Sequence, residues 1–312
     1  MTSGAPAAVR IWLPGRRTLV TGATLNPAGP DPLPTVVIAT RNRRERLLAT
    51  LGRLCSLPDR PAIVVVDNAS EDGTAAAVSR AYPGVRLIEA TDEIGSAART
   101  LGVRAAETPL VAFSDDDSWW APGALRTAVQ VFEAYPDLAL IAARIVVEPR
   151  GALDPTCERM RDSPLRAELP LPGPAVLGFM ACGAVARRSA VLSCSGFHPR
   201  YGFGGEEHLL AVDMAAAGWG LAYVDDVVAH HQPAPGPRAW RGTTEVRNRL
   251  WSAWLRRPLP TAVRLTIVTM VRRSGGGRAL LAALPGLPWI ARERRVVPAR
   301  VEVALRALDV ER

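Results

Sequence analysis

Short apolar runs alternate with segments of helical spacing over the first part of the chain. The runs with the length and composition of buried strands are TVVIAT (35–40), AIVVVD (62–67), VRLIEA (85–90) and LVAFSD (110–115). The segments between them with the leucine or alanine spacing of helices are RERLLATLGRL (44–54), SEDGTAAAVSRAY (70–82) and GSAARTLGVRAA (95–106). This alternation predicts βαβ units, and therefore an α/β fold with a parallel sheet flanked by helices.

The pattern loosens after about residue 138 but continues. LALIAARIVVE (138–148) and GLAYVDDVVAHH (220–231) have the pattern of strands, and FMACGAVARRSAVL (179–192) that of a strand followed by a helix. YGFGGEEHLLAVDMAAAGW (201–219) is a glycine-rich loop that opens a helix. Residues 149–177 are rich in proline and charge, which predicts a loop.

The two ends of the chain differ from its middle. Residues 1–34 are broken by Pro, Gly and Arg, and we expect an irregular arm and linker with a hairpin around Pro14-Gly15. Residues 35–235 form the expected α/β domain. Residues 236–312 mix arginine with Trp, Leu and Val at helical spacing, which predicts amphipathic helices broken at Pro258, Gly275–Gly277 and Pro285.

The charge is concentrated in this C-terminal region. All 38 basic residues are arginine, and 30 acidic residues leave a formal net charge of +8. Residues 236–312 hold 16 arginines and five acidic residues, a net charge of +11. Such a surface favours anionic partners, but nucleic acid is discounted because no recognisable binding module is present. Helices packed on the α/β domain, peripheral contact with an anionic membrane and a protein interface remain as alternatives.

The cysteines and the apolar runs bear on the cellular location. Cys55, Cys157, Cys182 and Cys194 match no zinc-site spacing, and we expect reduced core thiols. Neither a secretory signal nor an apolar stretch of about 18 residues is present. The expectation is a cytoplasmic protein, with peripheral contact at the inner face of the membrane as an alternative.

Polar side chains follow three of the predicted parallel strands. Thr40 and Arg41 end the first, Asp67 ends the second, and Asp115, Asp116 and Asp117 end the fourth. Ligands bind at the carboxyl ends of strands in such sheets. Carboxylates spaced as Asp115 and Asp117 suit Mg²⁺ or Mn²⁺, with substrate phosphates completing the coordination. A solvated acidic turn before a helix is the structural alternative.

Five segments occur together in one order and spacing: TVVIATRNR, IVVVDNASEDGT, EIGSAARTLGVRAA, LVAFSDDDSWWAPGAL and GFGGEEHLLAVDMAAAGW. In this the chain resembles family 2 glycosyltransferases, over roughly residues 35–232. The resemblance implies a GT-A fold, a Rossmann-like mixed sheet flanked by helices, here with a helical C-terminal extension. It implies metal-dependent, inverting transfer of a sugar from a nucleotide-diphosphate donor to an acceptor hydroxyl, using Mg²⁺ or Mn²⁺. The acceptor could be a polysaccharide, a lipid-linked sugar or a small molecule.

The resemblance also implies roles for individual residues. The implied donor-binding residues are Thr40, Arg41, Asp67, Arg99, Asp115 and Asp116. The implied metal ligands are Asp117, Asp115, His231 and His230. Four positions depart from the family pattern. Arginine replaces an aromatic residue at position 41, and threonine replaces asparagine at position 100. The family's Glu-Asp pair is Glu206-Glu207 here, and a further family aspartate would fall at Leu209. A solvated or packed histidine pair is the alternative for His230 and His231.

The same resemblance implies a general base and a set of residues that contact the acceptor. Glu207 matches the position of the family's general base, and Glu206 beside it is the second candidate. Acids in a first helical turn also simply complement the helix dipole. The residues assigned to the acceptor are Trp119, Trp120, Gly205 and His208. Core packing is the alternative for the two tryptophans, and a helix-surface position is the alternative for His208.

Two other functions fit the α/β layout. A sugar-nucleotide nucleotidyltransferase would need a glycine-rich phosphate loop after the first strand, and ATRNRRERL contains no glycine. A non-catalytic nucleotide- or carbohydrate-binding module would have a degenerate site, whereas Asp67, Asp115, Asp117 and Glu207 are all present.

Overall fold

A mixed β-sheet forms the centre of the protein. The computed structural model describes residues 9–13, 16–21, 32–233, 241–272 and 275–310. In this part of the chain eleven strands form one sheet in the order β1-β2-β5-β4-β3-β6-β10-β8-β11-β7, with β9 paired to β8. The strands are β1 (Val9–Leu13), β2 (Arg16–Thr21), β3 (Thr35–Thr40), β4 (Ile63–Asp67), β5 (Arg86–Ala90), β6 (Leu110–Ser114), β7 (Ser118–Trp120), β8 (Leu138–Val147), β9 (Ala152–Leu153), β10 (Ala184–Arg187) and β11 (Gly220–His231).

The parallel part of the sheet consists of β5, β4, β3 and β6, as the sequence predicts. Its register pairs Thr40 with Asp67, so two of the predicted polar strand ends lie side by side. The strand β10 is antiparallel to both β6 and β8, and β11 runs parallel to β8. The carboxyl ends of β6 and β11 therefore lie at the same edge of the sheet as those of β3 and β4.

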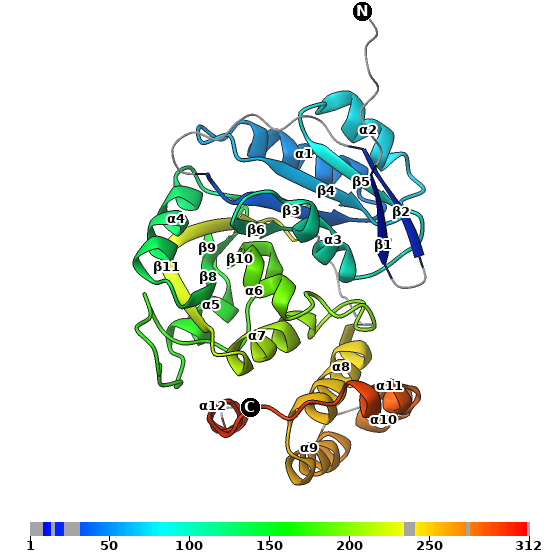
Figure 1. Ribbon diagram of the computed structural model, residues 1–312, viewed down its shortest axis with the longest axis vertical. Coiled ribbons are helices and arrows are strands. Elements are labelled where there is room, and N and C mark those ends of the chain that lie inside the picture. Colours follow the sequence, from blue (N-terminus) through cyan, green and yellow to red (C-terminus); the bar gives the residue numbers. More distant parts are fainter. Residues whose placement is uncertain (1–8, 14–15, 22–31, 234–240, 273–274, 311–312) are drawn as a thin grey trace, which may run out of the picture.

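Helices cover both faces of the sheet, with α1 (Arg44–Cys55) and α2 (Thr74–Ala81) on one side and α3 (Ala97–Ala105) and α7 (Glu206–Ala216) on the other (Figure 1). The remaining helices of this part are α4 (Ala124–Ala134), α5 (Pro155–Arg161) and α6 (Arg188–Ser193), with a 3-10 turn, η1 (Ala181–Gly183). A Cβ at Gly102 of α3 would lie 2.4 Å from a methyl group of Val37, so glycine permits the close packing of α3 on β3.

A helical region follows the sheet (Figure 1). Its helices are α8 (Arg241–Arg256), α9 (Leu259–Arg272), α10 (Gly276–Ala283), α11 (Leu287–Glu293) and α12 (Ala299–Val310), with a 3-10 turn, η2 (Leu284–Gly286), before α11. Breaks occur at the predicted prolines and glycines. Trp251 and Trp289 form a second core with Tyr201 of the α/β part, and Val301 of α12 packs with Val212 of α7. The helices are thus packed on the α/β part.

The structure confirms the expected antiparallel pairing around Pro14-Gly15 and corrects other expectations. The strands β1 and β2 pair antiparallel on either side of Pro14-Gly15, whose turn lies outside the described residues, and β2 extends the sheet beside β5. The expected loop at 149–177 contains β9 and α5, which Asp154 caps by accepting a hydrogen bond from Thr156 N at 2.7 Å. Cys55 is exposed rather than buried. No described helix is long and apolar enough to cross a membrane.

Candidate active site

Each aspartate of the triplet after β6 has its own basic partner. Arg99 donates to Asp115 at 2.6 Å. Arg43 lies 3.8 Å from Asp116, and Arg46 lies 3.3 Å from Asp117. Because the protein supplies these cations itself, the repulsion expected among three adjacent carboxylates is compensated without a metal ion. Arg43 and Arg46 were not predicted; their spacing of three residues at the start of a helix would place both on one face.

Two threonine hydroxyls hold Asp116 in place. The hydroxyl of Thr40 donates to its carboxylate at 3.0 Å, and the hydroxyl of Thr50 donates to its backbone carbonyl at 2.8 Å. Burial, followed by the charge of Asp117, raises the pKa of Asp116 to about 6. The side chain of Thr40, predicted to bind the donor, thus links the end of β3 to the aspartate triplet through a hydrogen bond.

Asp117 and His231 meet because β7 pairs with the end of β11. Ser118–Trp120 form the strand β7, in which Ser118 lies opposite His231. The His231 Nε2 atom lies 3.3 Å from Asp117 Oδ1. Burial opposes the charged form of each group, but their mutual attraction outweighs it. It raises the pKa of His231, and with Arg43 and Arg46 it lowers the pKa of Asp117.

The donor atoms of this pair suit a divalent ion. Two ligands about 2.1 Å from an octahedral ion lie roughly 3 Å apart when they are adjacent, close to the observed 3.3 Å. The described residues contain no group of three or more His, Cys, Asp or Glu side chains that could hold a metal ion. The pair would therefore hold an ion only with further ligands, such as substrate phosphate oxygens.

His230 points to a different set of residues. Its Nδ1 atom lies 2.9 Å from Glu148 Oε1, and its ring stacks on Trp119 with centroids 5.5 Å apart. The guanidinium of Arg53 lies 3.7 Å from the centroid of the same Trp119 ring. The structure thus does not bring His230 to Asp117. It gives Trp119 two stacking partners at the rim of the site.

Trp120 is fully buried in the main core. The prediction that it contacts an acceptor is wrong, because no part of its ring is accessible to a ligand. In a strand, successive side chains point to opposite faces, so Trp120 lies inside the core whereas Trp119 is only partly buried against it. The packing alternative is the correct one for this tryptophan.

Asp67 lies at the end of β4 and is almost fully buried. The backbone N–H of Ser70 donates to its carboxylate at 3.3 Å. Burial raises the pKa of Asp67 in spite of this bond and of the nearby charge of Arg41. Arg41 itself forms an ion pair with Glu93. Asp67 and Arg41 are therefore neighbours at the strand end, as their proposed shared role in donor binding requires.

Arg99 joins the aspartates to the glutamates. This side chain on α3 is nearly buried and donates to Asp115 at 2.6 Å, while its other terminal nitrogen lies 3.8 Å from Glu206. Burial opposes its charge, but the negative charges of Asp115, Glu207 and Glu206 raise the pKa of Arg99. Segments some ninety residues apart in the chain thus meet on one guanidinium.

Glu206 and Glu207 differ in their surroundings. Glu206 is buried, and its Oε2 atom has no hydrogen-bond partner among the described residues. Burial, followed by the charge of Glu207, raises the pKa of Glu206 to about 8, although Arg99 opposes the shift. Glu207 is half-buried. Burial raises its pKa as well, and Arg99 opposes this. Burial therefore favours the protonated form of both carboxyls, while Arg99 favours the charged form of both.

The loop before these glutamates is held by a residue that the sequence did not single out. Gly205 has φ +93°, a conformation that favours glycine, and directly precedes α7. Asn248 of α8 is fully buried, and its Nδ2 atom donates to the carbonyls of Tyr201, Phe203 and Gly204 at 2.9, 3.1 and 2.6 Å. No sequence pattern could have paired α8 with this loop.

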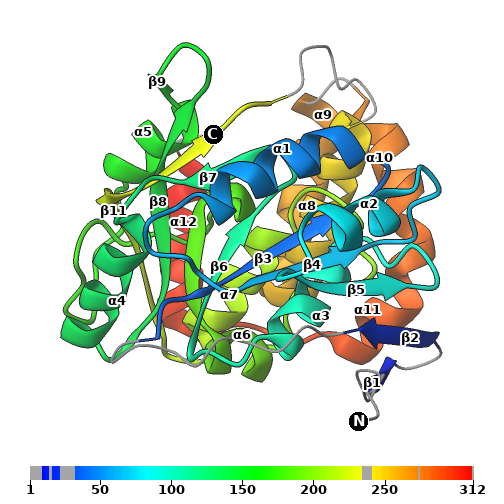
Figure 2. The same cartoon turned by 90° about the horizontal axis from the view of Figure 1, so that it is seen from above.

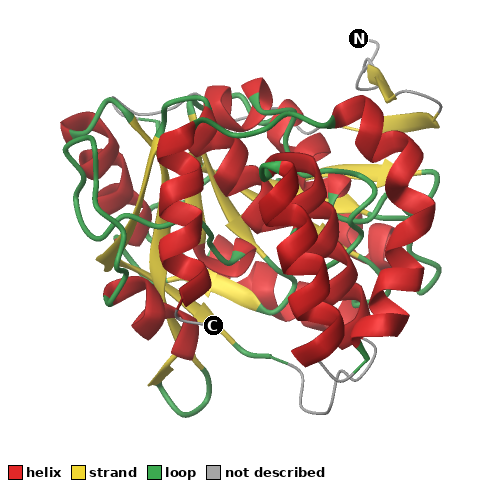
Figure 3. Cartoon of the chain, turned by 90° about the horizontal axis from the view of Figure 1, so that it is seen from below, coloured by secondary structure: helices red, strands yellow, loops and turns green. Residues whose placement is uncertain are grey.

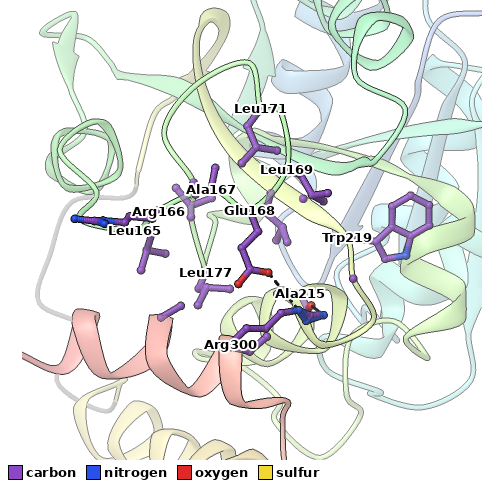
Figure 4. Close-up of a pocket in the computed structure, with 17 residues that line it drawn as sticks. Leu165, Arg166, Ala167, Glu168, Leu169, Leu171, Leu177, Ala215, Trp219 and Arg300 are labelled. Carbon is purple, nitrogen blue, oxygen red and sulfur yellow. Dashed lines mark hydrogen bonds and ion pairs between the residues drawn. The ribbon is translucent and has the colours of Figure 1, made fainter.

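His208, assigned to the acceptor, lies in the first turn of α7. Its Nδ1 atom lies 2.9 Å from the carbonyl oxygen of Leu177. A cavity of about 320 Å³ adjoins Leu177 and is lined mainly by leucines, Trp219 and the ion pair of Glu168 with Arg300 (Figure 4). It borders the last turn of α7, about 15 Å along the helix from Glu206. None of the predicted site residues lines this cavity.

Comparisons with known proteins bear on the family of this chain. The family model described as glycosyl transferase family 2 matches residues 35–193. An N-acetylglucosaminyl-diphospho-decaprenol L-rhamnosyltransferase of Mycobacterium tuberculosis is 25% identical over 292 residues, covering 78% of this chain and 94% of the relative. The predicted resemblance is confirmed.

Solved structures support the fold class. A mannosyltransferase from Pyrobaculum calidifontis, in complex with GDP-Man and Mn²⁺, has a TM-score of 0.57 at 22% identity and covers 90% of this chain and 87% of its own. TarS 1–349 of S. aureus, in complex with UDP-GlcNAc, has a TM-score of 0.55 at 13% identity. The match covers 81% of this chain and 71% of the TarS chain. The predicted mixed α/β sheet with a helical C-terminal region is confirmed.

Proposed function

The chain belongs to glycosyl transferase family 2, and we propose that it is a metal-dependent, inverting enzyme that transfers a sugar from a nucleotide-diphosphate donor to an acceptor hydroxyl. The family match and the glycosyltransferase relative support sugar transfer from a nucleotide sugar. We assign catalysis to residues 35–235 and a supporting role to the helical region 236–312.

The position of Arg99 carries this proposal. Its guanidinium contacts Asp115 at 2.6 Å and Glu206 at 3.8 Å, which places the donor-side carboxylates next to the glutamate pair. A displacement at an anomeric carbon requires a leaving diphosphate on one side and a base on the other, within one site. Arg99 would also stabilise negative charge that develops on the leaving group.

Glu207 is the proposed base. It is partly exposed, whereas Glu206 is buried. We assign the proton of the pair to Glu206, whose pKa is raised to about 8, and removal of the proton from the attacking oxygen to Glu207. Asn248 and Gly205 fix the helix start from which both glutamates project.

Asp117 and His231 are the residues that would hold Mg²⁺ or Mn²⁺. The metal would supply positive charge to the diphosphate oxygens of the leaving group. The separation of 3.3 Å between the carboxylate oxygen and the imidazole nitrogen supports ligation by both. The Pyrobaculum calidifontis mannosyltransferase, a structural neighbour, was crystallised with GDP-Man and Mn²⁺.

Thr40, Arg41, Asp67, Asp115 and Asp116 form the proposed donor side. The buried carboxylate of Asp67 would accept a hydrogen bond from the nucleotide base of the donor, and Arg41 would lie against the plane of that nucleotide base. The relative from Mycobacterium tuberculosis is named for an acceptor carried on a diphospho-decaprenol. We therefore propose a lipid-linked acceptor and a cytoplasmic protein that works beside the membrane. Trp119 would line the acceptor side, where its ring already stacks with His230 and Arg53.

A panel of nucleotide sugars tests the proposal. The full chain is screened by thermal shift with Mn²⁺, because a bound donor raises apparent stability by mass action. Donors that bind are then assayed for release of nucleoside diphosphate with Mn²⁺ and with a chelator, and the product's anomeric configuration is read by NMR. Metal-dependent release with inversion supports the proposal. Release of pyrophosphate from a nucleoside triphosphate and a sugar phosphate would support a nucleotidyltransferase instead, and binding without any release would support a non-catalytic module.

A further inference from the structure

The helix α9 exposes an apolar stripe that no described residue covers. Leu259, Val263, Ile267, Met270 and Val271 have relative exposures between 48% and 78%. At 100° per residue, all five lie within one arc of about 120°. Large apolar side chains usually lie inside a protein when they occur in such a row, and an exposed apolar patch marks an interaction site.

The opposite side of α9 fixes the helix to the protein. Thr261 and Ala262 are buried, and the hydroxyl of Thr266 accepts a hydrogen bond from the Trp254 indole N–H at 2.9 Å. The stripe is therefore held outward by the packing of α9 on α8. Leu281 of α10 and Leu284 after it are also exposed, on segments that follow α9 directly.

The charge around this stripe is mainly positive, although Asp309 of α12 lies 3.9 Å from Arg264. Residues 246–292 contain nine arginines and no acidic residue. Arg264 and Arg272 of α9 and Arg278 of α10 are exposed. An apolar stripe flanked by arginine is the composition of a helix that lies in the interface of an anionic bilayer.

We propose that α9, with the start of α10, docks this protein on the surface of an anionic lipid bilayer. A helix of 14 residues is about 21 Å long, shorter than a bilayer's hydrocarbon core of about 30 Å, so α9 would lie in the interface and not span it. A second copy of the chain is a less suitable occupant, because a two-fold interface would bring the same arginines against one another.

This docking would place the site near lipid. Asn248 of α8 holds the loop before Glu206, and α8 leads directly into α9. Figure 2 shows α9 at the edge of the molecule toward which the chain leaves β11 after His231, and Figure 3 shows the helices of the C-terminal region side by side on one face. The inference stands on the surface of α9 alone and does not depend on the proposed sugar transfer.

Co-sedimentation with vesicles tests the proposal. The full chain is mixed with vesicles of phosphatidylcholine alone or of equal parts phosphatidylcholine and phosphatidylglycerol. We expect binding to the anionic vesicles to be at least tenfold stronger, and to weaken as salt is added. The double variant Ile267→Asp with Met270→Asp should lower binding at least tenfold, because two apolar side chains leave the interface. The matched control is Val303→Asp on α12, whose side chain is 68% exposed outside the stripe.

A second pair of variants tests the charge. Arg272→Glu with Arg278→Glu should lower binding to anionic vesicles at least fivefold, while Arg80→Glu on the exposed face of α2 should leave it within twofold. An unchanged thermal midpoint shows that each variant folds. Equal binding to both kinds of vesicle, or equal loss in the control variants, would overturn the proposal. Sedimentation velocity tests whether a second copy of the chain covers the stripe instead. If the wild type is a dimer, and the α9 variants dissociate it without changing vesicle binding, the stripe is a dimer interface and the proposal is overturned.

Discussion

The side-chain nitrogen of Asn248 on α8 lies 2.6 Å from the carbonyl oxygen of Gly204, two residues before the buried carboxyl of Glu206. The same nitrogen also bonds the carbonyls of Tyr201 and Phe203. A helix of the C-terminal region therefore fixes the loop that starts α7. Asn248 is a positioning residue: it touches the loop and not a reacting group.

Replacement of Asn248 by alanine should leave these carbonyls unpaired inside the protein. We expect a loss of about 2 kcal/mol in unfolding free energy and a larger fractional loss in kcat than in donor affinity. Asn248→Asp keeps the size of the side chain but places an acceptor against the carbonyls, so it should do no better. Thr243→Ala, an exposed position on the same helix, is the control. Equal losses of kcat and donor affinity in Asn248→Ala would contradict a positioning role.

The two glutamates should respond differently to conversion into glutamine. Glu207→Gln removes the proposed base and should lower kcat about 100-fold or more while donor binding is kept. Glu206→Gln resembles the protonated form that Glu206 already has at neutral pH, and should lose less than tenfold. Initial rates and donor affinities of both variants are compared with those of the wild type. If Glu206→Gln lowers kcat more than Glu207→Gln does, the base is Glu206.

The raised pKa of Glu206 makes stability depend on pH. Its folded pKa is about 8 against an ordinary value of 4.5, since burial and Glu207 disfavour its charge. Between these values the folded state binds more protons than the unfolded state, so this group's contribution to stability is present at low pH and is lost as pH rises toward 8. Glu206→Gln should therefore be more stable than the wild type at about pH 8, by roughly 1–3 kcal/mol, and similar to it near pH 4.5.

Urea unfolding at both pH values measures this difference. Glu168→Gln, a change at an exposed carboxyl, is the control and should show little dependence on pH relative to the wild type. A difference between Glu206→Gln and the wild type that stays constant across the range would show that Glu206 titrates normally in the folded protein.

The adjacent histidines His230 and His231 should differ in their effect on metal-dependent donor binding, because only His231 contacts Asp117. Asp117→Ala and His231→Ala should each weaken Mn²⁺-dependent donor binding at least about tenfold, because they remove the two donors that lie 3.3 Å apart. His230→Ala should change it by less than about threefold, since His230 contacts Glu148 and Trp119 instead. Calorimetry with Mn²⁺ and with a chelator gives the affinities. Donor affinity unchanged in Asp117→Ala would refute its role as a ligand.

Arg99 should be needed for activity, because its guanidinium contacts both Asp115 and Glu206. Arg99→Ala leaves the glutamate pair without its nearest cation, and we expect kcat to fall about 100-fold. Arg99→Lys keeps the charge but cannot span Asp115 and Glu206 with a planar fork, so it should recover only part of the activity. Arg104→Ala on the same helix is the control. Full activity in Arg99→Lys would show that charge alone is needed.

Local pattern predicted most of the elements of this fold. The strands that end at Thr40, Asp67 and Ser114 were predicted because short continuous apolar runs that alternate with helical segments are typical of buried parallel strands. The topology rule for parallel sheets then placed Asp67 and the aspartates at one edge, and the family pattern added Glu207 and His231. The breaks in the C-terminal helices followed from proline and glycine chemistry.

Only the tertiary structure decided which groups meet. Asp117 faces His231 because β7 pairs with the end of β11, and Trp120 is buried because of the face of β7 on which it lies. The contacts of Arg43 and Arg46 with the aspartates, and of Asn248 with Gly204, join segments whose sequences carry no sign of one another. Hydrophobic periodicity is a local property of the chain, whereas burial, charge compensation and pKa depend on neighbours that packing brings from distant positions. The sequence therefore determined the elements and the chemistry at their ends, and the packing of those elements determined each residue's partners.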